Sequence, residues 1–180
     1  MDKLFIFFVI LVSLPFLTNM AMTFSGRKKL VGPFEVTKVF DGDTLEAVGP
    51  RQKVFKVRLL GIDAPEAGNE REGRPAQPYS ERSEKYLRKA VEDQPVYFRG
   101  YGIDQFGRLL AEVFTDEKNI NLELLRAGLA EVYRGRLEDN FDPEPYWKTE
   151  EEARKSREGM WSMGDKYVSP REWRRYRGWG

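Results

Sequence analysis

The stretch from residue 40 to residue 66 begins with FDGDT (40–44) and ends with VRLLGIDAPE (57–66). An Asp-Gly pair between two runs of alternating apolar residues is a strong signal for a tight β-turn. Asp43 is therefore predicted at the point where a strand leaves that turn.

The end of this stretch carries two further acids beside a proline. Pro65 favours an extended conformation for the residue before it and stops the strand. Asp63 and Glu66 are therefore expected at a strand end, where loop residues are free to face solvent. Together with Asp43 they would bring three carboxylates to one edge of a sheet.

Outward from this stretch, apolar periodicity and turn residues predict five strands and three helices. The strands are expected at residues 34–40, 44–48, 53–62, 96–101 and 109–114. The helices are expected at residues 79–92, 120–127 and 142–158. Residues 67–78 are rich in glycine, proline and charge, which predicts a mobile, exposed loop. This order of elements is typical of an α+β domain with a small barrel.

The composition narrows the chemistry that the chain can perform. Its 180 residues suit one globular domain with terminal extensions, and it contains no Cys and no His. Thiolate or imidazole zinc sites, Cys or Ser/His nucleophile systems and disulfides are thereby excluded. Any metal must be held by oxygen atoms, which favours a hard cation such as calcium or magnesium.

Charge is unevenly distributed along the chain. Residues 34–161 carry 21 Lys and Arg against 26 Asp and Glu, whereas residues 162–180 carry five against two. Proteins that bind nucleic acid through a general phosphate-neutralising field are usually basic. An acidic central domain argues against such a field and leaves a local site as the alternative.

Residues 4–24 form an uncharged, largely apolar run of 21 residues. A helix of that length would be roughly 30 Å long and could cross a bilayer, although the same run also fits a signal-peptide core or a buried helix. Residues 1–25 are thus expected to be a transmembrane anchor or a signal peptide, followed by a basic linker at 26–33. The basic residues in that linker favour a domain on the cytoplasmic or matrix side of the membrane.

Several motifs together resemble the staphylococcal nuclease (thermonuclease) family. They are DGDT (41–44), RLLGIDAPE (58–66), DQFGR (104–108), AGLA (127–130) and GMWS (159–162). The resemblance implies a five-stranded OB-type β-barrel with three helices over residues 34–162, preceded by the hydrophobic helix and followed by a basic aromatic tail at 163–180. The tail and the apolar N-terminus are more similar to the fungal mitochondrial, membrane-associated members than to secreted bacterial ones.

The resemblance also implies a calcium site. Asp43, Asp63 and the backbone carbonyl of Ala64 would coordinate Ca²⁺. Ala64 stands where a family member has a side-chain hydroxyl, but only its carbonyl is needed.

Three further residues receive catalytic roles from the same resemblance. Glu66 would be the general base toward an attacking water, and Arg58 and Arg108 would clamp the phosphate. These reactions yield a 3′-phosphate and a 5′-hydroxyl in this family. Phe106 stands where the family prototype has a tyrosine, so one phenol hydrogen bond to nucleotide, worth roughly 0.5–1.5 kcal/mol, would be missing.

Each of these residues also has an ordinary structural explanation. Asp43 could be a turn residue, Arg58 could tie a strand to an acid, Glu66 could be an exposed acid and Arg108 could flank a hairpin. Their joint occurrence favours the functional interpretation.

The sequence therefore predicts a membrane-tethered, monomeric, calcium-dependent nuclease that hydrolyses DNA and RNA. It would be anchored by a single span through residues 4–24, in mitochondria on the subgroup resemblance, or secreted if that segment is cleaved. The rival hypothesis is a catalytically silent nuclease-like module that binds nucleic acid or a protein partner.

Overall fold

The computed structural model describes residues 29–116 and 118–176. The predicted N-terminal hydrophobic helix, whether anchor or signal peptide, lies outside the described residues. Within the described ranges, no helix is both long and apolar enough to cross a membrane.

In the part of the chain that the structure describes, eight strands form one large sheet and one small one. They are β1 (Val31–Val39), β2 (Thr44–Val48), β3 (Val54–Leu59), β4 (Ile62–Asp63), β5 (Val96–Ile103), β6 (Leu109–Thr115), β7 (Lys118–Asn119) and β8 (Glu131–Val132). In the large sheet the order is β3-β2-β1-β5-β6-β7, and β4 pairs separately with β8.

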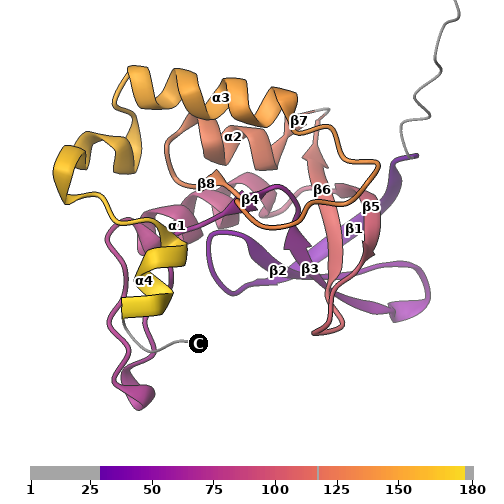
Figure 1. Cartoon of the computed structure of the whole chain (residues 1–180). Helices are drawn as coiled ribbons and strands as arrows, with labels where there is room; N and C mark the ends of the chain where they lie inside the picture. The colour runs from indigo at the N-terminus through magenta and orange to yellow at the C-terminus, as the bar shows by residue number, and fades with distance from the viewer. Residues whose placement is uncertain (1–28, 117, 177–180) are drawn as a thin grey trace, which may run out of the picture.

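Parallel pairing of β3 with β6 closes the large sheet into a barrel. The register runs from Val57 opposite Leu109 to Leu59 opposite Ala111, whereas the other pairs in this sheet are antiparallel. The predicted five-stranded barrel is thus confirmed, as a mixed barrel of β1, β2, β3, β6 and β5 (Figure 1).

The barrel interior follows the period of two expected of strands. Leu45 and Ala47 of β2 and Val57 and Leu59 of β3 are fully or almost fully buried, and the residues between them are more exposed. Alternation in the sequence therefore marks the side of each strand that faces the core.

Four α-helices accompany the barrel among residues 29–116 and 118–176. They are α1 (Ser80–Val91), α2 (Ile120–Arg126), α3 (Glu144–Lys155) and α4 (Pro170–Tyr176), with a 3₁₀ segment at Gly159–Lys166. In Figure 1, α2 and α3 lie side by side over one end of the barrel. The first three match the predicted helices, and α4 falls in the tail for which no helix was predicted.

Asn121, at the start of α2, ties two strands together from inside the fold. Its side chain is fully buried, and its Nδ2 donates to the carbonyls of Leu60 (2.8 Å) and Ala111 (3.2 Å). Its Oδ1 accepts from the backbone N–H of Val113 at 3.0 Å. One side chain thus fixes the end of β3 against β6.

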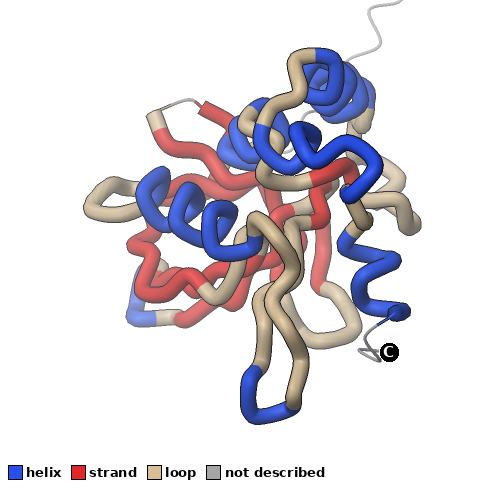
Figure 2. The backbone as a smooth tube through the Cα atoms, turned by 90° about the vertical axis from the view of Figure 1, so that its left-hand side faces the viewer, coloured by secondary structure: helices blue, strands red, loops and turns tan. Residues whose placement is uncertain are grey.

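Three segments differ from the prediction. Strand β1 begins at Val31, inside the stretch expected as a basic linker at 26–33. The run expected as one strand at 53–62 is interrupted by a turn at Leu60 and Gly61, where Gly61 has a φ of +82°, and the chain continues as the two-residue strand β4. The loop at 67–78, drawn at the bottom of Figure 2, is largely exposed, but Gln77 at its end is buried. Gln77 is buried because the chain after the barrel packs against it through the carbonyl of Val168.

Candidate active site

Arg58 joins the two predicted metal-ligating aspartates. β2 and β3 pair Thr44 with Arg58, which brings Arg58 next to Asp43. Arg58 Nη1 lies 2.7 Å from Asp43 Oδ2, and Arg58 Nη2 lies 3.2 Å from Asp63 Oδ1. Both aspartates are buried, at 6% and 3% exposure. Buried carboxylates at this spacing need a fixed positive charge, and Arg58 supplies it.

The turn before β2 holds Asp43 in place. Asp41 Oδ1 accepts the backbone N–H of Asp43 (3.0 Å), and Ala64 N–H donates to Asp43 Oδ2 (2.8 Å). Gly42 permits this approach, because a Cβ there would lie 2.0 Å from Ser83 Oγ and 2.7 Å from the Ala64 Cβ. The hairpin tip is thereby pressed onto α1 and onto the loop after β4.

Burial and neighbouring charges shift the pKa values of this cluster in opposite directions. Burial raises the pKa of Asp43 well above its usual range, against the opposing charge of Arg58. Burial by itself would lower the pKa of Arg58, but the neighbouring carboxylates of Asp43 and Asp63 raise it overall. The guanidinium is therefore a permanent charge at the base of the site.

The expectation that Asp63 and Glu66 face solvent is wrong for Asp63 and only partly right for Glu66. Asp63 is buried because β4 pairs with β8, placing it opposite Glu131. Glu66 is partly buried, and its backbone N–H donates to Gln77 Oε1 at 3.0 Å. Burial raises the pKa of Glu66, while the guanidinium of Arg174 opposes the shift.

Arg108 enters the site from the hairpin between β5 and β6. Its Nε and Nη2 both lie 2.7 Å from Asp104 Oδ2, and Asp104 Oδ1 accepts the backbone N–H groups of Phe106 and Arg108. The ring of Phe106 is 72% exposed, with the Arg108 guanidinium 5.4 Å from its centroid. Asp104 thus fixes both the hairpin tip and the direction of Arg108.

These residues share one cleft of about 660 Å³. All six predicted site residues line it, namely Asp43, Arg58, Asp63, Ala64, Glu66 and Arg108. Tyr133 and Arg136 add an aromatic ring and a positive charge to its wall. The geometry therefore brings the six together although they come from four separate segments of the chain.

Arg174, which sequence reasoning missed, also lines this cleft. It comes from α4, and its Nη1 and Nη2 lie 3.1 and 2.8 Å from the two carboxylate oxygens of Asp63. It also forms an ion pair with Glu66. The only signal in the sequence was the basic aromatic composition of the tail, which says nothing of where the tail docks.

The oxygen atoms of Asp43, Asp63 and Ala64 could supply some, but not all, of the ligands that a hard cation needs. Asp43 and Asp63 share one guanidinium and adjoin the backbone of Ala64, which is consistent with two carboxylates and a carbonyl as ligands. Across residues 29–116 and 118–176, no three acidic side chains are grouped closely enough to hold a metal by themselves. Water molecules would have to supply the remaining ligands.

The chain is similar to known proteins over most of its length. The profile of the family described as "Staphylococcal nuclease homologue" matches residues 56–163, which include Arg58, Asp63, Glu66 and Arg108. Asp43 and Arg174 lie outside that match, and both line the same cleft.

Individual relatives agree with the family match. "Probable endonuclease LCL3" of Clavispora lusitaniae is 33% identical over 177 residues, covering 83% of this chain and 74% of the relative. Proteins of the same name from Candida albicans and Botryotinia fuckeliana are 37% and 38% identical over 71% and 69% of this chain. The chain spans 57% and 49% of those two relatives. With the profile match over more than half of its length, the chain belongs to the staphylococcal nuclease homologue family.

Proposed function

We propose that the protein is a calcium-dependent phosphodiesterase that hydrolyses DNA and RNA to 3′-phosphate and 5′-hydroxyl products. The observation that carries this proposal is the buried Asp43–Arg58–Asp63 cluster, which lies in the same cleft as Glu66 and Arg108. The relatives named as endonucleases support the same class of reaction.

Each side chain then has a chemical task. Water must lose a proton as it attacks phosphorus, and we assign this proton to the carboxylate of Glu66, which lines the cleft. Negative charge grows on the phosphate oxygens, where the planar donors of Arg58 and Arg108 stabilise it. Asp104 keeps Arg108 aimed into the cleft, which lowers the entropic cost of binding phosphate.

Asp43, Asp63 and the carbonyl of Ala64 would hold the calcium ion. When bound, such an ion supplies positive charge to the phosphate oxygens and the leaving group. Calcium fits this site better than magnesium, because it accepts irregular sets of oxygen ligands whereas magnesium requires a near-ideal octahedron.

We also propose that residues 4–24 tether the domain to a membrane, in mitochondria on the resemblance of the termini. The support is the length of the uncharged run and the basic residues that follow it. The domain is proposed to act as a monomer, because the six site residues all come from one chain.

The rival function is a silent module that binds nucleic acid or a protein partner. One observation favours it: Arg174 neutralises the two acids, Asp63 and Glu66, that catalysis would need. Against it, the acids and arginines expected of an active site are all present in the cleft.

A digestion assay separates the two functions. Plasmid DNA and a structured RNA are incubated with the purified full chain in millimolar calcium, in magnesium, or with excess EGTA. We expect cleavage in calcium and none with EGTA. Undiminished activity in EGTA would exclude calcium dependence, and binding without cleavage in every buffer would support the silent module.

A further inference from the structure

Helix α4 directs the guanidinium of Arg174 at two acids of the cleft. The contact with Asp63 is a two-pronged fork, with Nη1 to Oδ1 at 3.1 Å and Nη2 to Oδ2 at 2.8 Å. Nη1 also donates to Glu66 Oε1. Paired hydrogen bonds between a guanidinium and a carboxylate are among the strongest side-chain contacts in proteins. Helix α4 is therefore bonded directly to two acids that the proposed reaction uses.

Asp63 then carries two guanidinium groups. Arg58 contacts Oδ1 at 3.2 Å, and Arg174 contacts both carboxylate oxygens. The Asp63 side chain is only 4% exposed, so water screens these charges weakly. A divalent cation on the same oxygens would face two fixed positive charges. Docking of Arg174 and binding of a cation at Asp63 are therefore opposed.

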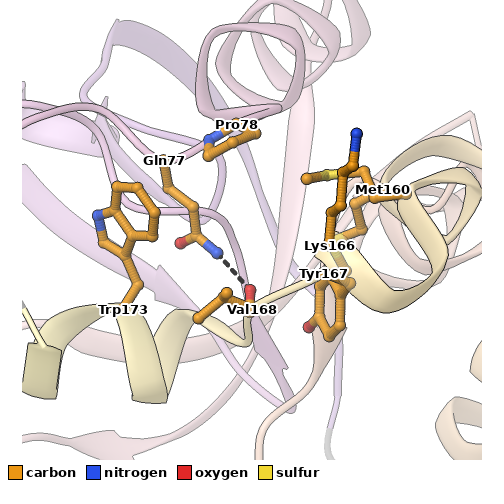
Figure 3. A pocket seen from close by; sticks show the side chains of 8 residues that line it. Gln77, Pro78, Met160, Lys166, Tyr167, Val168 and Trp173 are labelled. Carbon is orange, nitrogen blue, oxygen red and sulfur yellow. Dashed lines mark hydrogen bonds between the residues drawn. The ribbon is translucent and has the colours of Figure 1, made fainter.

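The position of α4 is fixed by contacts outside the cleft. Figure 3 shows Trp173 beside Gln77, whose Nε2 donates to the carbonyl of Val168 at 2.7 Å. The space left between these groups is about 20 Å³, little more than one water molecule needs. Ser169 and Glu172 bond each other across the first turn of the helix. Helix α4 is thus capped by Ser169 and Glu172. Its docking contact, called the seat below, is formed by Gln77, Val168 and Trp173.

The same seat touches the proposed general base. Gln77 Oε1 accepts the backbone N–H of Glu66 at 3.0 Å, so one side chain holds both the docked tail and the loop that carries Glu66. Movement of α4 would therefore change the surroundings of Glu66 through two contacts: the hydrogen bond from the Glu66 backbone to Gln77 and the ion pair with Arg174.

We propose that α4 is an autoinhibitory latch, in which Arg174 takes the place of the divalent cation at Asp63 and also pairs with Glu66. The latch rests on the proposed function, because it regulates the same site. Two states follow: a latched one with α4 docked, and an open one in which a cation replaces the guanidinium. If about 90% of molecules are latched, the apparent cation affinity is about tenfold weaker than that of the open site.

Calcium affinity is the first test, measured by titration calorimetry on the full chain. Arg174→Gln should lower the calcium Kd about tenfold, while Arg175→Gln, one position along the same helix and exposed, should leave it unchanged. Trp173→Ala removes packing beside Gln77 and leaves Asp63 and Glu66 themselves unchanged, and it should shift the Kd in the same direction as Arg174→Gln. Equal affinities for the Arg174 and Arg175 variants would overturn the latch, as would the absence of calcium binding in all of them.

The position of α4 is the second test, and it does not depend on activity. Because the chain has no Cys, Lys85→Cys and Tyr176→Cys allow two spin labels to be attached at exposed positions on α1 and α4. Calcium should broaden and lengthen the distance distribution between the labels, and Arg174→Gln should do so without calcium. A distribution that saturating calcium leaves unchanged would contradict the proposal.

Nuclease assays then distinguish the latch from the function on which it rests. Arg174→Gln should raise the rate several-fold at limiting calcium and match the parent at saturating calcium. A chain that is inactive in every buffer, yet shows the calcium competition, would refute the nuclease and leave the latch standing. A rate below the parent at saturating calcium would instead make Arg174 a substrate-binding residue and refute the latch.

Discussion

At the scale of single residues, Glu66 is held from three directions. Its backbone N–H bonds Gln77, its carboxylate pairs with Arg174, and Pro65 fixes the chain before it. The carboxylate is therefore positioned by the fold, and removing its charge need not disturb the surrounding structure.

Glu66→Gln should lower the rate of DNA hydrolysis about 10²–10⁴-fold, the usual span for loss of a general base. Burial raises the pKa of Glu66, and only the deprotonated carboxylate accepts a proton. The parent protein should therefore lose activity on acidification at a higher pH than a glutamate with an ordinary pKa would cause. Initial rates across pH measure both. Glu70→Gln, on the exposed loop, is the matched control and should keep the parent rate.

Arg108→Ala should cost a similar factor in rate, because it removes a donor to the phosphate. The same rate in Arg108→Ala and the parent would mean that Arg108 serves only the hairpin through Asp104. Thermal unfolding of the variant separates this hairpin role from a catalytic one.

At the scale of elements, Asn121 links helix α2 to the barrel. Asn121→Ala would leave two carbonyls and one N–H without their buried partner, and we expect it to lower the free energy of unfolding by about 2–4 kcal/mol. Urea unfolding measures the change. Asn140→Ala, at an exposed position, should stay within about 0.5 kcal/mol of the parent, and equal losses for both variants would refute the linking role.

The sequence predicted the positions of the strands and helices well, but it did not predict the side-chain contacts that hold these elements together. Alternation predicted all five barrel strands because one face of each strand meets a continuous core. Asn121 and the docking of Arg174 gave no such signal, since each depends on a contact with residues about 10 to 111 positions away. Motifs predicted six candidate site residues, and the structure brings all six to one cleft. The burial of Asp63 depends on the pairing of β4 with β8, and strands of two residues leave no pattern in the sequence.

At the scale of the whole molecule, Glu131 connects the barrel end to the segment before α4. Its Oε2 accepts from the Tyr167 hydroxyl at 2.6 Å, and burial raises the pKa of Glu131 to about 7. Glu150 and Asp63 add negative charge nearby, while Arg134 opposes it.

A raised pKa on an acid means that the folded state binds its proton more tightly than the unfolded chain. The stabilisation from Glu131 is therefore complete below about pH 4.5 and is lost as pH rises through about 7, a change on the order of 3 kcal/mol. Urea unfolding of the chelator-treated protein between pH 4.5 and 8 measures it. Glu131→Gln should flatten that slope, and an unchanged slope would show that another group is responsible.

The N-terminal run makes a prediction for the intact protein in cells. If residues 4–24 are an uncleaved anchor, the chain should stay in the membrane pellet after carbonate washing and retain its N-terminus by mass spectrometry. Deleting residues 1–25 should release it. A soluble mature chain beginning near residue 22 to 27 would instead identify a signal peptide.

Parallel pairing of β3 with β6 joins positions about fifty residues apart, Val57 with Leu109, and it sets the order in which the molecule can assemble. Such long-range contacts slow folding, because a large loop must close before they form. During synthesis on the ribosome, strand β3, which carries Arg58, would lack its β6 partner until β6 and the neighbouring Arg108 have emerged. The helix that bears Arg174 is synthesised after β6, so for a few seconds of translation, at about 5–20 residues per second, the barrel can close before Arg174 is available to dock.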